Sequence, residues 1–180
     1  MTKVLIPLAE GCEEMEAVII IDVGRRAGWA VTAAGLQPGP VRGSRGVVLV
    51  PDALWDKTDP GAFDLLVLPG GGPGTQRLAG DERILAAVRA FHAAGKRLGA
   101  VCAGPLVLQQ AGVLDGRRAT CHPNVAGRLT RARYVNEPVV VDGTITTSQS
   151  AGTCIAFALD LIRQIDGEEK CAAVRRGLAL

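Results

Sequence analysis

A cysteine lies at the junction of an apolar segment and a segment that starts a helix. Arg97–Val101 is a candidate strand, Cys102 follows it directly, and Pro105–Ala111 is a candidate helix. The Ala-Gly pair after the cysteine permits the sharp turn of a nucleophile elbow, which exposes a side chain at the end of a sheet. A thiol at a helix N-terminus lies at the positive end of the helix dipole, which favours the nucleophilic thiolate. The alternative is a small buried hydrophobe, a common role of cysteine.

A run of glycines offers backbone amides to a negatively charged group. Gly70-Gly71-Gly72 follows the apolar segment that ends at Leu68. The amides of Gly70 and Gly71, together with that of Ala103, are candidates to hold an oxyanion or an oxidised sulfur. The run is not a phosphate-binding loop, because no Lys-Ser or Lys-Thr pair follows, and its spacing does not match a dinucleotide fingerprint. A plain glycine–proline turn is the alternative.

One histidine is a candidate base for Cys102. His122, in the segment Thr120–Pro123, is one of only two histidines, and histidine commonly activates a cysteine nucleophile. A structural role is the alternative. His92 lies in a segment of charged and alanine residues and is expected to face solvent. Adjacent Cys121 and His122 do not have the spacing of zinc ligands, so no metal is predicted.

A cluster of carboxylates opens the helix expected over Glu13–Ala27. Glu13 and Glu14 are expected to face water and to stabilise the helix N-terminus. Glu16 comes one position after apolar Met15, and we expect it to point over the strand ends toward the elbow. Burial beside a thiolate raises the pKa of a carboxyl, which would let Glu16 donate a hydrogen bond to sulfur.

The elements that must position these residues alternate between short apolar runs and segments of helical period. This alternation predicts an α/β fold whose mostly parallel sheet is covered on both faces. Strands are expected at Val4–Leu8, Trp29–Ala34, Phe63–Leu68 and Arg97–Val101, with a hairpin arm at Val47–Val50 and a hairpin around Asp142-Gly143 that joins Val139–Val141 to Thr144–Thr147. Helices are expected at Glu13–Ala27, Asp81–Ala94, Pro105–Ala111, Ala151–Ile165 and Glu168–Arg176. Ligands of such sheets collect at the carboxyl ends of the strands, where Cys102 lies.

Composition narrows the function classes. The chain has 180 residues, of which 48% are hydrophobic, and one domain over residues 1–180 is predicted. The net charge of +2 and the 3% aromatic content disfavour binding to nucleic acid or to anionic membranes. Five scattered cysteines predict reduced thiols. The first apolar run is too short for a signal peptide or a membrane span, so a cytoplasmic location is expected.

Several motifs together resemble the ThiJ/PfpI superfamily, and most closely its parkinsonism-associated deglycase branch with the bacterial members. The matching segments run in order along nearly the whole chain: Glu10–Ala17, Asp22, Arg25–Gly28, Ser44–Gly46, Leu68–Gly71, Val101–Pro105, His122–Pro123 and Thr147–Ser148. The resemblance implies a flavodoxin-like three-layer sandwich, usually a homodimer. At Ser150-Ala151-Gly152 the chain departs from the Gly-Pro-Gly that is frequent in the family.

The resemblance also implies roles for individual residues. Cys102 corresponds to the family's nucleophile and oxidation-sensitive cysteine, Glu16 to its protonated carboxyl partner, and His122 to its general base. Gly71 and Ala103 match positions whose amides hold an oxyanion. Arg26 and Arg45 are expected near the site on the dimer side.

Three functions follow as hypotheses. The first is a glutathione-independent glyoxalase and protein deglycase that acts on methylglyoxal and early glycation adducts, responds to oxidative stress and needs no cofactor. The second is a redox-sensing chaperone in which Cys102 is oxidised to a sulfinate held by Glu16. The third, an intracellular cysteine protease, is least favoured, because no third group is evident that would orient His122. The expected partners are small dicarbonyl or glycated substrates and a second copy of the chain.

Overall fold

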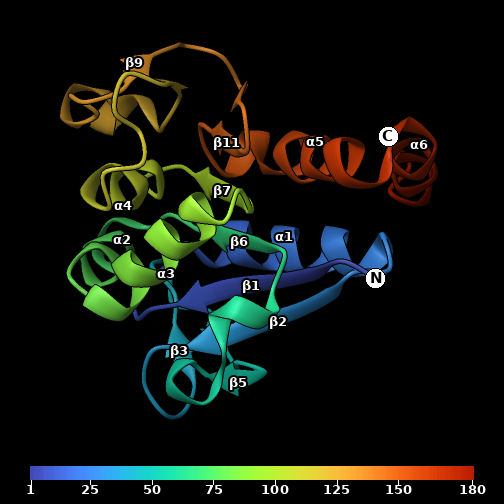
Figure 1. Cartoon of the computed structure of the whole chain (residues 1–180). Coiled ribbons are helices and arrows are strands. Elements are labelled where there is room, and N and C mark those ends of the chain that lie inside the picture. Colours follow the sequence, from blue (N-terminus) through green and yellow to red (C-terminus); the bar gives the residue numbers. More distant parts are fainter.

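A seven-stranded sheet forms the centre of the computed structural model, which describes residues 1–180 (Figure 1). Its order is β10-β11-β7-β6-β1-β2-β5, and every neighbouring pair is parallel except the antiparallel hairpin β10–β11. The strands are β1 (Lys3–Leu8), β2 (Ala30–Gly35), β5 (Ala53–Leu54), β6 (Leu65–Leu68), β7 (Arg97–Val101), β10 (Val139–Asp142) and β11 (Ile145–Ser148). The β2-β1-β6-β7-β11 part has the strand order of flavodoxin-like sheets.

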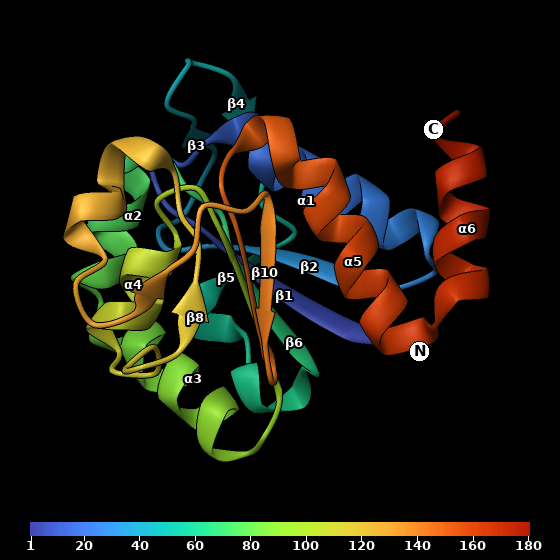
Figure 2. The same ribbon diagram turned by 90° about the horizontal axis from the view of Figure 1, so that it is seen from above.

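Helices cover both faces of the sheet, as Figure 2 shows: α2, α3 and α4 on one side, and α1, α5 and α6 on the other. The helices are α1 (Glu14–Arg26), α2 (Gly72–Ala79), α3 (Glu82–Ala93), α4 (Pro105–Gln110), α5 (Cys154–Asp166) and α6 (Glu168–Gly177). The predicted three-layer sandwich with a mostly parallel sheet is confirmed. None of these helices combines the length and the apolar character needed to cross a membrane.

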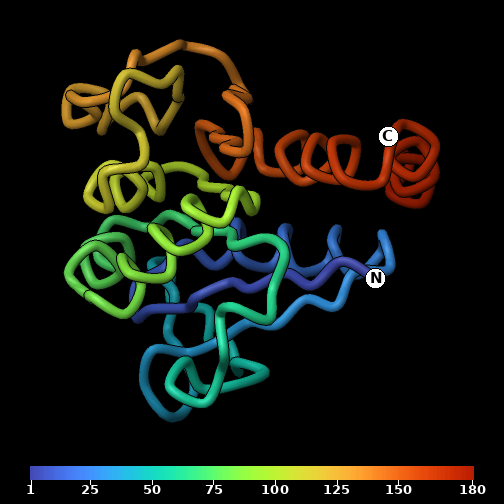
Figure 3. Tube along the Cα trace, in the orientation of Figure 1, coloured from blue at the N-terminus to red at the C-terminus, as the bar shows by residue number.

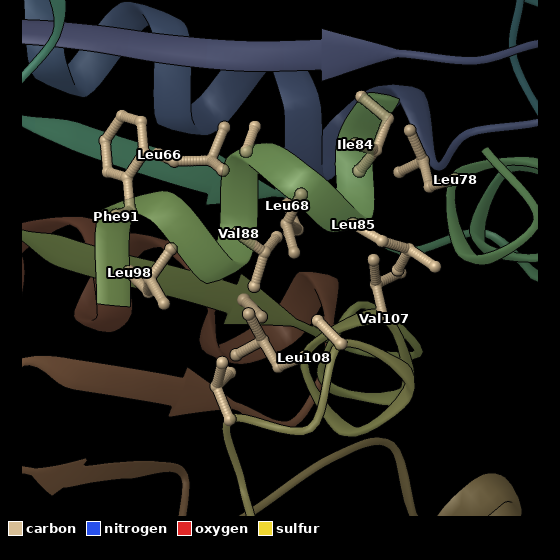
Figure 4. Close-up of a cluster of buried hydrophobic side chains, with 14 of the residues drawn as sticks. Leu66, Leu68, Leu78, Ile84, Leu85, Val88, Phe91, Leu98, Val107 and Leu108 are labelled. Carbon is tan, nitrogen blue, oxygen red and sulfur yellow. The ribbon is translucent and has the colours of Figure 1, made fainter. Parts of the chain in front are cut away.

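Two hydrophobic cores lie on the two faces of the sheet. Successive side chains of a strand point to opposite faces, so Leu66 of β6 belongs to one core and Val67 to the other. In the first core, side chains of β6 and β7 meet Val88 and Phe91 of α3 and Leu108 of α4 (Figure 4). Because both faces are buried, the strands are apolar runs rather than alternating ones.

The chain ends lie away from the candidate site. The N-terminus and helix α6 occupy the same side of the molecule (Figure 3). Strands β1, β6 and β7 run parallel to one another, so they all end on the opposite side. The segments that carry Glu16, at the start of α1, and Gly71 and Cys102, in turns, follow those three strand ends.

Two local predictions need correction. No helix was predicted in the glycine–proline run after β6, but Gly72 begins helix α2. The helix tolerates Pro73 because proline suits the first turn, and Gly74 is required because a Cβ there would lie 2.6 Å from the Cα of Cys12. In the β10–β11 hairpin Asp142 pairs with Ile145, so the turn is one residue later than predicted.

Short elements complete the fold. The predicted hairpin arm is present as β4 (Val48–Leu49), which pairs antiparallel with β3 (Val41–Arg42). No sequence pattern indicated β5, β8 (Arg118–Ala119), β9 (Arg133–Tyr134) or the 3₁₀-helices η1 (Trp55–Lys57), η2 (Pro60–Ala62) and η3 (Pro123–Arg128). The helix predicted over Ala151–Ile165 begins as a fourth 3₁₀-helix, η4 (Ala151–Thr153), and continues as α5.

Candidate active site

Cys102 occupies the turn between β7 and α4 with a left-handed backbone φ of 62°. Only Ala179 among the other non-glycine residues has a positive φ. Such a conformation costs on the order of 1–3 kcal/mol and persists only when its surroundings hold it. Here the amide of Cys102 donates to the Ser148 carbonyl at 3.0 Å, and its own carbonyl accepts from the His122 amide at 2.8 Å. The structure thus places Cys102 on the strained turn that the sequence predicts.

Glycines bring the loop after β6 against this turn. A Cβ on Gly70 would lie 2.5 Å from the Cβ of Cys102 and 2.8 Å from Oε2 of Glu16. A Cβ on Gly104 would lie 2.6 Å from the Leu68 carbonyl oxygen. Only residues without side chains permit these approaches. As a result, the amides of Gly71 and Ala103 lie close enough to the Cys102 sulfur to lower the pKa of its thiol.

Glu16 is buried behind the sulfur, with only 1% of its surface exposed. Its Oε2 accepts a 2.8 Å hydrogen bond from the Gly70 amide, which is therefore turned to the carboxyl rather than to the oxyanion position expected for it. The Cys102 thiol and the Ala151 amide also lie close enough to this carboxyl to lower its pKa. Burial raises the pKa of Glu16 to about 7, and these polar neighbours offset only part of the rise.

The thiol of Cys102 and the carboxyl of Glu16 compete for a proton. Burial, followed by the negative charge of Glu16, raises the pKa of Cys102 to about 12, against the lowering effect of the Gly71 and Ala103 amides. The sequence argument from the helix dipole expected a lowered pKa, because it included neither the burial of the thiol, which has the largest effect, nor the charge of Glu16. Two groups that interact this strongly titrate as a pair. When Glu16 holds the proton its charge disappears, and its hydroxyl becomes a donor to the sulfur.

The other two carboxylates of the cluster do not both face water, which corrects the prediction for Glu14. Glu14 is 5% exposed, and its Oε1 accepts from the amides of Arg45 at 2.8 Å and Val47 at 3.2 Å. Burial would raise the pKa of Glu14, but backbone amides and the Ser44 hydroxyl hold it below its ordinary value. Glu13 caps α1 by accepting from the Glu16 amide at 2.8 Å.

A cavity of about 350 Å³ opens beside Cys102. It brings together most of the predicted site residues; its lining consists of Glu13, Ser44, Arg45, Gly71, Gly72, Pro73, Cys102, Ala103, His122 and Val125. Arg26 is not among them. It lies near the C-terminal end of α1, paired with Asp22, ten residues or roughly 15 Å of helix from Glu16. The expectation that Arg26 lies near the site is therefore not met within one chain.

The ring of His122 has a defined local role. Its Nδ1 accepts a 3.2 Å hydrogen bond from the Asn124 amide and so caps η3. With Nδ1 as the acceptor, the neutral ring carries its proton on Nε2 and presents a donor there. This arrangement favours hydrogen-bond donation to substrate oxygen over the general-base role that the family resemblance implies for His122.

The start of η4 was not recognised as part of the site. Ala151 is the first residue of η4, and the first amides of a helix have no partner within it. The amide of Ala151 is thereby free to reach Glu16. The available signal was the Ser-x-x-Thr pattern of Ser150 and Thr153, which forms a capping box in the structure. No group of three or more metal-ligating side chains is present, and all five cysteines are free.

Comparison with known proteins agrees with this geometry. Residues 2–164 match the model of the DJ-1/PfpI family. The chain belongs to the DJ-1/PfpI family. The structure superposes on crystallographic DJ-1beta of Drosophila melanogaster with a TM-score of 0.96 and 37% sequence identity, over 99% of this chain and 98% of that one.

Curated relatives extend this family assignment. Protein DJ-1 homolog B of Arabidopsis thaliana is 40% identical over 93% of this chain. The chain spans only 39% of this homolog B and 43% of Protein DJ-1 homolog A of the same plant, which is about two fifths of each. The glutathione-independent glyoxalase DJR-1.2 of Caenorhabditis elegans is 34% identical, over 98% of this chain and 95% of that protein. A deglycase of Thermococcus kodakarensis is 33% identical, over 89% and 98%.

The influence of the Ala151 amide on the Glu16 carboxyl leads to a first prediction. Ala151→Pro removes the amide hydrogen at a first-turn position where proline is tolerated, and the extended Ser150 before it (φ −168°, ψ 178°) suits a following proline. Without this donor the carboxylate is less stable, so we expect Glu16 to deprotonate about one pH unit higher. The infrared band of the protonated Glu16 carboxyl, assigned by its loss in Glu16→Gln, is followed against pH, and the pH at which half of the band remains is the midpoint of the Glu16 titration.

Gly152→Ala is the matched control, because it alters the next residue but keeps the Ala151 amide. The midpoint should not move in this variant. An identical midpoint in wild type and Ala151→Pro would show that the amide has no influence on the carboxyl.

Proposed function

We propose that the chain is a cysteine-dependent, glutathione-independent glyoxalase and deglycase that acts on methylglyoxal and on early glycation adducts of proteins. The observation that carries the proposal is the Cys102 sulfur beside an open cavity, in contact with two amides and with a buried carboxyl whose pKa is about 7. The names of the Caenorhabditis elegans and Thermococcus kodakarensis relatives, a glyoxalase and a deglycase, support it.

The reaction begins with transfer of the thiol proton to Glu16. The resulting Cys102 thiolate attacks the aldehyde carbon of methylglyoxal and forms a hemithioacetal. The aldehyde oxygen becomes an alkoxide, which the amides of Gly71 and Ala103 stabilise once the sulfur has given up its charge. Glu16 then returns the proton to this alkoxide and becomes a carboxylate.

The next step moves hydrogen between the two substrate carbons. The Glu16 carboxylate removes the proton from the sulfur-bearing carbon, which gives an enediolate with its negative charge on the oxygen of the second carbon. The hydroxyl proton of the first carbon moves to that oxygen, and protonated Glu16 delivers its proton to the second carbon, so that the first carbon becomes a thioester carbonyl. His122 donates a hydrogen bond to the oxygen on that second carbon. The product is a lactate thioester of Cys102. Water cleaves it, which releases lactate and restores the thiol; the net reaction is methylglyoxal plus water to lactate, without an external oxidant or reductant.

Lactate formation by site variants tests this mechanism. Cys102→Ala should abolish turnover, because the covalent intermediate cannot form. Glu16→Gln should lower kcat about 100-fold or more, since it removes the proton acceptor, and His122→Gln should lower it about tenfold. Cys171→Ala is the control and should keep full activity, because it removes a buried cysteine of α6 that packs against α5. Full turnover by Cys102→Ala would refute the proposal.

A second candidate function is redox sensing at the same sulfur. The Gly71 and Ala103 amides and protonated Glu16 are placed to hold the oxygens of a sulfinate, which forms when the thiol consumes two molecules of peroxide and releases two of water. After mild peroxide treatment, intact-mass analysis should show a gain of two oxygens that is absent in Cys102→Ala and weaker in Glu16→Gln. Equal oxidation of wild type and Cys102→Ala would eliminate this role.

Assembly, location and the chaperone role are proposals of the same kind. Exposed apolar side chains on α1, Met15 at 56% and Val18 at 46%, support a homodimer; a monomer in sedimentation velocity would overturn it. Free cysteines throughout the chain support a reducing cytoplasm. A protease is disfavoured, because Nδ1 of His122 bonds to a backbone amide rather than to an orienting carboxylate.

A further inference from the structure

A second groove adjoins the cavity beside Cys102. It has a volume of about 380 Å³ and lies between α2, α4 and η3; Figure 2 shows α2 and α4 side by side. Gly72, Ala103 and Val125 line both the groove and the cavity. A molecule whose reactive carbon lies at the Cys102 sulfur can therefore extend into this α2–α4 groove.

The groove carries positive charge only. No carboxylate lines it, and Arg128 is its only charged residue. Arg128 takes part in none of the ion pairs of the chain, although eight other arginines do. The unopposed guanidinium makes the groove a site for an anion, since it offers several donors in a planar fork that suits carboxylate and phosphate.

Neutral donors add to this cation. The side-chain amides of Gln76 and Gln110 line the groove. Gln109 has a supporting role: its amide nitrogen donates to the Arg128 carbonyl at 2.9 Å and its oxygen accepts from the Arg131 amide at 3.0 Å, which fixes η3 against α4.

A hydroxyl without a partner is found on the same wall. Thr75 of α2 is only 3% exposed, and its hydroxyl forms no hydrogen bond within the protein. Buried hydroxyls are normally hydrogen-bonded. The Thr75 oxygen is covered by protein atoms, so its hydroxyl is an unmet polar group within the wall of the groove rather than a donor open to a ligand.

We propose that the α2–α4 groove binds an anionic group, a carboxylate or a phosphate, on the carrier part of a dicarbonyl adduct whose reactive carbon lies at Cys102. The inference rests on the proposed function for the identity of the reacting group. It extends that function by separating two parts of the substrate: the dicarbonyl carbons occupy the cavity, and the acidic carrier occupies the groove. Adducts with acidic carriers are therefore better substrates than neutral ones.

Matched alkylating probes test the groove without requiring turnover. N-(iodoacetyl)glycine and N-(iodoacetyl)glycinamide differ only in a carboxylate, and N-(iodoacetyl)phosphoethanolamine and N-(iodoacetyl)ethanolamine differ only in a phosphate. In each case the Cys102 sulfur forms a bond to the methylene carbon and iodide leaves. The acid-to-neutral rate ratio, followed by peptide mass spectrometry at Cys102, reports attraction of the anion.

We expect this ratio to fall about threefold to fivefold in Arg128→Gln, the size expected of a partly solvated ion pair. Arg131→Gln is the matched control. It removes the same charge nearby, from a side chain that pairs with Asp115 and does not line the groove; the ratio should not change.

A fall confined to the carboxylate pair or to the phosphate pair supports the groove and identifies the carrier class, and a fall in both supports a general anion site. No fall in either pair, or an equal fall in Arg131→Gln, would overturn the proposal. The outcome is separable from the proposed function. If the wild type shows the Arg128-dependent preference for acidic probes but forms no lactate from methylglyoxal, the proposed glyoxalase activity is refuted and the proposed anion site in the α2–α4 groove stands.

Discussion

The mutual influence of the Glu16 carboxyl and the Cys102 thiol on each other's pKa is the interaction on which the candidate site depends. Both groups are removed from water, which disfavours charge on either one, and each raises the pKa of the other when it is charged. Between the two pKa values, about 7 and about 12, the pair therefore carries a single negative charge and a single shared proton. Amides of Gly71 and Ala103 favour the charge on sulfur, whereas those of Gly70 and Ala151 favour it on the carboxylate.

Backbone geometry keeps this balance in place. The left-handed turn at Cys102 is held by hydrogen bonds to Ser148 and His122, residues far along the chain. The close approach of Gly70 leaves no room for any side chain between the sulfur and the carboxyl. Backbone donors cannot rotate away as side chains can. The negative charge of the Cys102–Glu16 pair is therefore surrounded by fixed amide dipoles instead of water. This preorganisation is the usual source of catalytic electrostatic stabilisation.

Local patterns in the sequence predicted much of this arrangement. Apolar runs of four to six residues identified the long strands, and Asp81 identified the start of α3, where it accepts from the Arg83 amide. The elbow at Cys102 was predictable because every feature that indicates it is local in the sequence: an apolar strand before the cysteine, the small residues Ala-Gly after it, and a helix that begins at Pro105. Helix α2 was missed since its Gly-Pro-Gly start has poor helix propensity, and packing of Gly74 on Cys12 overrides that preference.

Properties that depend on distant contacts could not be predicted. Glu14 and Glu16 look alike in sequence, yet one anchors the β3–β4 turn and the other contacts the elbow. The predicted direction of the Cys102 pKa was wrong because a helix dipole is a local feature, whereas the largest influences on the thiol are its burial and a carboxylate 86 positions earlier. Arg26 matched a family motif, but its position along α1 separates it from the cavity.

The position of the shared proton is measured most directly by the ultraviolet absorbance of the thiolate, taken as the difference between wild type and Cys102→Ser from pH 5 to pH 9. If Glu16 holds the shared proton, loss of the first proton from the pair leaves the charge on sulfur. The thiolate signal then appears with a midpoint near pH 7, where the pair first titrates, rather than near the pKa of about 12 that Cys102 has beside a charged Glu16. A sulfur that shows no thiolate until pH 9 would retain its proton at neutral pH, and Glu16 would not be the group that accepts it.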